Sequence, residues 1–194
     1  IQGGGNGSRA NLKRDNQMSD IIETFNFSRN NVDFTVNVVC AYTNDGFGDQ
    51  WKMTDTHEGG VTISNSEADR NSFKYAIPQQ CTLAQLTKEY AAQGRENPSR
   101  EAYDSLQRQL IRDINASDYY FTVDASAGSH TLLDGAVIGC GFDYSYEDQG
   151  SLLDVAREVW SDYNGEEEAL SEAVQAARDL LDGVDVLKSV VESV

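Results

Sequence analysis

Apolar and polar positions alternate most clearly over residues 32–43. β-Branched and aromatic side chains, together with Cys40, occupy every second position there, which is typical of a strand with one buried face. The segment Asn44-Asp45-Gly46 follows and favours a turn. Shorter stretches of the same kind predict strands over residues 50–55, 60–64, 72–77, 118–125 and 131–146. The positions expected on the buried face of the first strand are Val32, Phe34, Val36, Val38, Cys40 and Tyr42.

A helical period replaces the alternation after residue 81. Thr82 and Gln85 form a capping box at the start of the first predicted helix, and Gly94 is a natural end for it. The next helix is predicted to begin at Asn97-Pro98, a capping residue followed by a proline that suits the first turn. Its apolar positions continue as far as Ile114. The spacing therefore predicts a helical hairpin.

A second helical hairpin is predicted after residue 150. Ser151 caps its first helix and Gly165 is expected to end it, and a second helix is predicted over residues 166–181. The tail over residues 184–194 carries aliphatic side chains at helical spacing, which we expect to dock on the body of the protein or on a second copy. An undocked tail would expose a sizeable apolar patch. These positions are Val184, Leu187, Val191 and Val194.

The order strands, then helical hairpin, occurs twice. Phe34-Thr35-Val36 is echoed by Phe121-Thr122-Val123, and the capped helix starts at Thr82 and Ser151 resemble each other. This predicts an α+β fold in which an antiparallel sheet packs against helical hairpins, with one half at residues 18–116 and another at residues 117–194. The halves are either a duplication or two amphipathic hairpins that are alike by chance.

Residues 1–17 differ in composition from the rest. They contain six glycine, asparagine or serine positions in a row, three basic residues and almost nothing apolar. We interpret this segment as an artificial leader, with a native flexible arm as the alternative.

The net charge of the chain is its most informative property for predicting function. The chain has 32 acidic and 15 basic residues, a formal net charge of -17. Such a polyanion repels nucleic acid and anionic membranes, so neither is expected as a direct partner, whereas a basic protein is. Simple solubility and adaptation to a salty cytosol are the alternatives. The three widely spaced cysteines indicate no disulfide framework, and with no apolar signal segment they favour a cytoplasmic protein, in a host cytoplasm if it is viral.

No motif predicts a catalytic residue, a metal site or a cofactor. His57 and His130 lie outside any HExxH or H-x-[ST] pattern, and we interpret both as loop or surface residues. Gly139-Cys140-Gly141 favours a closely packed strand over an exposed thiol. Residues 44–49 resemble a calcium loop only superficially, because the EF-hand spacing and the terminal glutamate are absent.

Acidic residues are densest at the C-terminal end. Residues 143–194 contain 14 acids and 3 bases. Carboxylates on helices at spacings of three or four lie about 5–6 Å apart, which approaches the charge spacing of a phosphate backbone. A solvated helical face is the alternative. The residues predicted to bind a basic partner are Asp143, Glu147, Asp148, Asp154, Glu158, Asp162, Glu166, Glu167, Glu168 and Glu172.

These patterns favour a non-enzymatic binding or inhibitor protein. Its polyanionic surface would mimic nucleic acid and face a basic partner, such as a nucleic-acid-handling or host-defence protein. Small acidic inhibitors without enzyme motifs are common among phages and mobile elements, which supports this hypothesis by analogy. One alternative is a viral or mobile-element structural protein whose acidity is incidental. The other is an enzyme with a carboxylate or metal site that has no linear motif.

Overall fold

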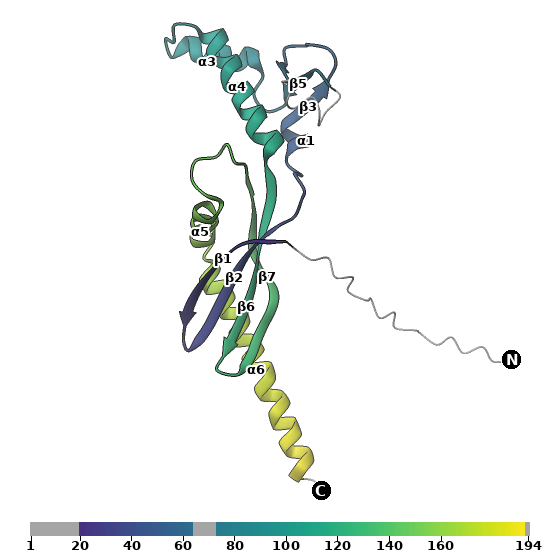
Figure 1. The fold of residues 1–194 in the computed structure, drawn as a ribbon, viewed down its shortest axis with the longest axis vertical. Coiled ribbons are helices and arrows are strands. Elements are labelled where there is room, and N and C mark those ends of the chain that lie inside the picture. Colours follow the sequence, from purple (N-terminus) through teal and green to yellow (C-terminus); the bar gives the residue numbers. More distant parts are fainter. Residues whose placement is uncertain (1–19, 64–72, 193–194) are drawn as a thin grey trace, which may run out of the picture.

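A computed structural model describes residues 20–63 and 73–192, with the side chains at 140, 186, 187, 190 and 192 excepted. It confirms an α+β fold with antiparallel sheets and helices packed against them. The molecule is elongated, with a larger sheet and its helices at one end and a smaller sheet with its helices at the other (Figure 1). We refer to these two parts as the large lobe and the small lobe.

The large lobe is built on four antiparallel strands in the order β1-β2-β6-β7. These are β1 (Ile21–Arg29), β2 (Val32–Cys40), β6 (Ser117–Ala127) and β7 (His130–Tyr144). The strands predicted over 32–43, 118–125 and 131–146 correspond to β2, β6 and β7. Strand β1 was not predicted, although it forms a hairpin with β2 through Asn30 and Asn31, which both adopt positive φ angles.

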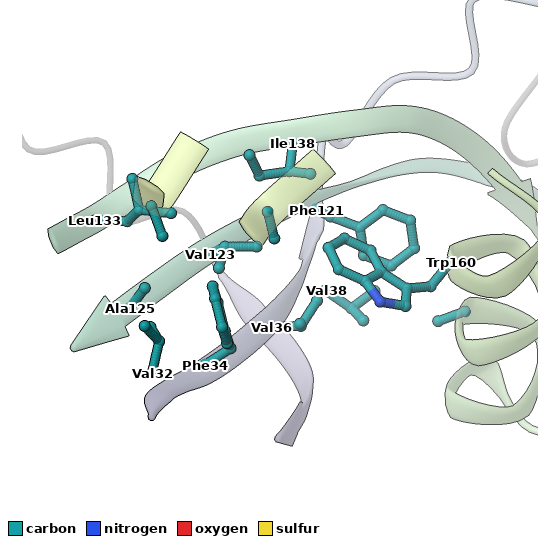
Figure 2. Packing of buried hydrophobic residues seen from close by; sticks show 13 residues of the cluster. Val32, Phe34, Val36, Val38, Phe121, Val123, Ala125, Leu133, Ile138 and Trp160 are labelled. Atoms are coloured by element: carbon teal, nitrogen blue, oxygen red, sulfur yellow. The ribbon is translucent and has the colours of Figure 1, made fainter. Parts of the chain in front are cut away.

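The helices α5 (Leu152–Asp162) and α6 (Gly165–Glu192) cover one face of this sheet. The core between them is made of alternate residues of β2 and β6, as the period of two predicts. Tyr42, also predicted on the buried face, lies beyond the end of β2 and is exposed. Trp160 of α5 lies against Phe121, with 5.2 Å between ring centroids, and Figure 2 shows the two rings beside Val38. Each fully buried large side chain in this core contributes about 1.5–3 kcal/mol to folding. Its buried members include Phe34, Val36, Val38, Phe121, Val123, Leu133, Ile138 and Trp160.

The small lobe lies between β2 and β6 in the chain. Its sheet has the order β3-β5-β4, and α4 packs against it with α3 alongside. Its core is a separate cluster that includes Trp51, Val61, Leu106 and Leu110. Its elements are α1 (Phe47–Gln50), β3 (Trp51–Thr54), β4 (Val61–Thr62), β5 (Tyr75–Pro78), α3 (Leu83–Ala92) and α4 (Pro98–Asn115). The strands predicted over 60–64 and 72–77 extend partly outside the described residues.

Local capping signals were good predictors of helix starts. The reciprocal hydrogen bonds of a capping box join Thr82 to Gln85 at the start of α3, and Ser151 to Asp154 at the start of α5. The Asn97 side chain, by contrast, makes no capping hydrogen bond, although α4 does begin at Pro98.

Two predicted boundaries in the second helical hairpin were wrong. Gly165 does not end α5. It is the first residue of α6, and Asn164, with φ of 55°, makes the turn between the helices. The predicted break between residues 181 and 184 is also absent, because α6 continues through Gly183 to Glu192. Residues 184–192 of the predicted tail are therefore the end of one long helix, which extends past the end of the sheet (Figure 1).

Both predicted halves contribute strands to the larger sheet. The β1–β2 hairpin comes from residues 18–116 and the β6–β7 hairpin from residues 117–194, and β2 pairs with β6. The two helical hairpins pack on different sheets. The duplication and its boundaries stay a prediction, and the segment 1–17 lies outside the described residues.

Candidate partner-binding surface

Two of the ten predicted acids, Asp143 and Asp148, bind the same arginine. The guanidinium of Arg112 in α4 donates to Asp148 through Nε at 2.8 Å and Nη2 at 3.1 Å, and it also binds Asp143. It contacts Asp113 as well, at 3.2 Å. Asp113 is buried and accepts a hydrogen bond of 2.8 Å from the Trp51 indole. This cluster joins α4 to the end of β7 and the loop that follows it.

The cluster shifts the pKa values of Arg112 and Asp148. Hydrogen bonds to Asp148, Asp143 and Asp113 raise the pKa of Arg112, with Asp148 having the largest effect. Burial of the guanidinium acts in the opposite direction but is outweighed. Burial raises the pKa of Asp148, but hydrogen bonds from Arg112 and from the Ser145 N–H lower it by more, so its pKa lies below the ordinary value. Asp148 is therefore held ionised by an internal partner.

Three further acids have internal contacts that leave them on the surface. Asp154 accepts hydrogen bonds from the hydroxyl and N–H of Ser151, which lower its pKa. Glu167 forms an ion pair with Arg29 of β1 at 2.7 Å. Glu168 accepts a hydrogen bond of 3.3 Å from the Gly139 N–H. All three carboxylates remain exposed.

The other five predicted acids are exposed, and their carboxylates have no hydrogen bond or ion pair within the part of the chain that the structure describes. Glu158 and Asp162 lie four residues apart on α5, in line with Asp154. Glu166 and Glu172 lie on the N-terminal half of α6, and Glu147 lies in the loop before α5. We refer to Asp154, Glu158, Asp162, Glu166, Glu168 and Glu172 as the acidic helix surface.

The end of α6 presents a second unusual surface, which is apolar. Leu180, Leu181, Val184 and Val191 are 51%, 64%, 45% and 76% exposed. The end of α6 extends past the sheet in Figure 1, and none of these four residues belongs to either hydrophobic core cluster. We refer to these four residues as the apolar end of α6. Two of them, Val184 and Val191, belong to the tail in which a contact was predicted.

The residues considered for chemistry are separated. His57 and His130 are exposed, and His57 stacks edge-on with Tyr75. Cys40 is buried in β2, and Cys81 is half-buried before α3. Within residues 20–63 and 73–192, no three His, Cys, Asp or Glu side chains lie where they could share a metal ion. No helix among these residues is long and apolar enough to cross a membrane.

Sequence reasoning missed the role of Arg112, because 31 and 36 residues separate it from Asp143 and Asp148. No local pattern carries that information. It also missed β1, although Phe25 and Phe27 alternate with polar residues immediately before an Asn-Asn turn. That signal was present in the sequence.

Comparison with known proteins gives no relative from which a function could be transferred: no family model matches the chain, and neither does any curated protein or solved structure.

Proposed function

We propose that this protein binds a basic partner protein through the acidic helix surface. The observation that carries the proposal is that Glu158, Asp162, Glu166 and Glu172 are exposed and have no cationic partner among the described residues. A carboxylate that already binds an arginine would have to give up that ion pair to bind a partner protein. These four carboxylates would give up only bound water.

The arrangement of the acids supports attraction over distance. Asp154, Glu158 and Asp162 follow one another at intervals of four residues, so their carboxylates form a line along α5. The N-terminal half of α6 adds three more. In a chain of net charge -17, this field steers a basic protein toward the helices and speeds association. Proteins that handle nucleic acid carry the complementary charge, so we propose a partner of that class, including host-defence proteins.

Asp143 and Asp148 are left out of the proposed surface. Both are bound by Arg112, and removing either would weaken the contact between α4 and β7. Their substitution would therefore test stability more than binding.

The test is a pull-down from lysate of the native host at low salt, with two variants of equal charge. The first carries Glu158→Gln, Asp162→Asn and Glu172→Gln. The matched control carries Asp49→Asn, Glu89→Gln and Glu96→Gln, three exposed acids of the small lobe. We expect the wild type and the control to capture the same basic protein and the first variant to lose it. Equal capture by both variants, or capture of nothing basic by the wild type, would contradict the proposal.

The apolar end of α6 supports a second candidate function, self-association. Apolar side chains at the start of α6 form a stripe that packs on the sheet. In the sequence, this stripe continues beyond the sheet with apolar residues at alternating intervals of three and four, as in a coiled coil. Val184 and Val191 occupy one set of positions, and Leu180 and Leu187 the other, a combination that favours a parallel dimer. The stripe consists of Leu170, Ala173, Ala177, Leu180, Val184, Leu187, Val191 and Val194.

A further inference from the structure

The middle of strand β1 has an outer edge that the usual protections do not cover, since the one bulge and the charges of Glu23 and Arg29 lie toward its ends. The strand is nine residues long, contains neither proline nor lysine, and carries no charge from Thr24 to Ser28. No strand among the described residues pairs with this edge. Proteins normally blunt such edges with charges, prolines or bulges, because unpaired backbone groups there recruit other chains.

The opposite edge of the same sheet is a useful contrast. Strand β7 contains Gly135 and Gly139 at positive φ angles, and its register with β6 shifts three times. It also packs against α6. Strand β1 has a single register shift, between Ile21 and Glu23, and pairs regularly with β2 from Glu23 to Arg29, so its edge is the less interrupted of the two.

A groove of about 500 Å³ runs beside β1, between that strand, α5 and the start of α6. Phe25 and Phe27 face it from β1, and Trp160 faces it from α5. Asn26 also lines the groove, although it points to the other face of the sheet. The groove must therefore reach the backbone edge of β1, where an added strand would lie.

One residue that lines the groove has a buried donor without an acceptor. Trp160 is 4% exposed, and its indole Nε1 has no hydrogen-bond partner in the part of the chain described. The rings of Phe25 and Phe27 lie beside the Trp160 indole, with 5.9 Å and 6.4 Å between ring centroids. Buried polar groups are normally satisfied, so an unpaired donor beside a groove points to a ligand that supplies the acceptor.

The charges of the groove fit a peptide better than a free anion. Arg29 is engaged with Glu167, which leaves Arg157 beside Phe25 as the available cation. Glu166 lines the same groove and would repel a small anion. A peptide backbone is neutral and has carbonyl oxygens that Arg157 and the Trp160 N–H can bind.

We propose that the groove between β1 and α5 binds an extended peptide of a partner protein, which adds a strand to β1 and inserts an apolar side chain between Phe25, Phe27 and Trp160. Backbone hydrogen bonds to β1 supply affinity, and the aromatic pocket selects the side chain. We expect basic residues on either side of the inserted one, because Glu158 and Asp162 lie on the same helix as Trp160. Only this expectation of basic flanks rests on the proposed function. The strand addition stands without it.

The experiment is selection of a displayed random peptide library against the full chain, followed by measurement of the selected peptides in solution. Two variants place the same bulky side chain on exposed serines. Ser161→Trp fills the groove, and Ser171→Trp lies on α6 outside it. We expect Ser161→Trp to weaken peptide binding at least tenfold and Ser171→Trp to leave it unchanged. Methylation of alternate peptide nitrogens should also abolish binding, and hydrogen exchange should slow at residues 23–28 when the peptide binds.

The outcomes separate the groove from the acidic helix surface. Selected peptides with an apolar centre but no basic flanks would support strand addition and count against the proposed function. Peptides that tolerate both methylation and Ser161→Trp, or the selection of none above background, would overturn the groove proposal. Without peptide, hydrogen exchange at residues 23–28 that becomes slower as the protein concentration rises would also overturn the groove proposal. A second copy of the chain would then occupy the edge.

Discussion

At the scale of single residues, Arg112 has the largest effect on the candidate surface. Its guanidinium binds three carboxylates from α4, β7 and the loop after β7. Two of the ten acids predicted to bind a partner are therefore partly neutralised inside the protein. The capping residues Thr82 and Ser151 were predictable because their partners lie three residues away. The partners of Arg112 were not, because the fold alone brings them together.

Asp148 should make stability depend on pH. Its pKa is lowered in the folded protein, so its contribution is complete above the unfolded pKa of about 3.9 and is lost as the pH falls through the folded pKa. Asp148→Asn should lower the free energy of unfolding by about 1–3 kcal/mol at pH 7. The loss of stability between about pH 5 and pH 2 should be smaller in the variant than in the wild type.

Urea denaturation at a series of pH values measures this difference. Asp162→Asn is the matched control, because its carboxylate is exposed and has no partner among the described residues. We expect the control to follow the wild-type curve. A steep acid loss in Asp148→Asn that parallels the wild type would show that this carboxylate does not hold the pH dependence.

The packing of Trp160 should require a glycine at position 165. A Cβ at this position would overlap the indole ring of Trp160, whereas a Cβ at Gly183 of the same helix would meet nothing. Gly165→Ala should therefore destabilise the protein by about 1–3 kcal/mol through overpacking. Gly183→Ala should stabilise it by about 0.5–1 kcal/mol, because alanine favours the helix. Thermal or urea unfolding of both variants checks the opposite signs, and a neutral Gly165→Ala would contradict the tight packing.

At the scale of elements, most helices and strands could be predicted and their partners could not. The period of two in β2 and the capping boxes of α3 and α5 are local properties. The pairing of β2 with β6, about 85 residues away, follows from packing and has no local pattern. The break expected near residue 183 failed for a physical reason. A single glycine costs a helix only about 1 kcal/mol, which the rest of α6 outweighs.

The apolar end of α6 should bring two copies together. Analytical ultracentrifugation should show dimers, and added salt should strengthen them, because each chain carries -17 charges and screening weakens their repulsion. Leu180→Asn with Val184→Asn should give a monomer. Ser171→Asn with Gln175→Asn, on the same helix but outside the stripe, should remain dimeric. A wild-type monomer at all salt and protein concentrations would refute self-association through this helix.

At the scale of the whole molecule, the acidic helix surface and the groove beside β1 both involve α5 and the start of α6. The sequence predicted a dense C-terminal run of acids, and the structure places six of them on α5 and the first half of α6. The groove beside β1 borders the same helix. The two proposals are therefore compatible: the carboxylates attract a basic partner, and strand addition to β1 holds it.

The salt dependence of partner binding tests the central proposal most directly. The dissociation constant of the captured basic protein should be measured by titration calorimetry from low to high salt. If the acidic helix surface binds it, affinity falls steeply with salt, and the variant Glu158→Gln, Asp162→Asn, Glu172→Gln binds about tenfold or more weakly with a shallower salt slope than the small-lobe control. An affinity that does not change with salt, or the same slope in both variants, would contradict it.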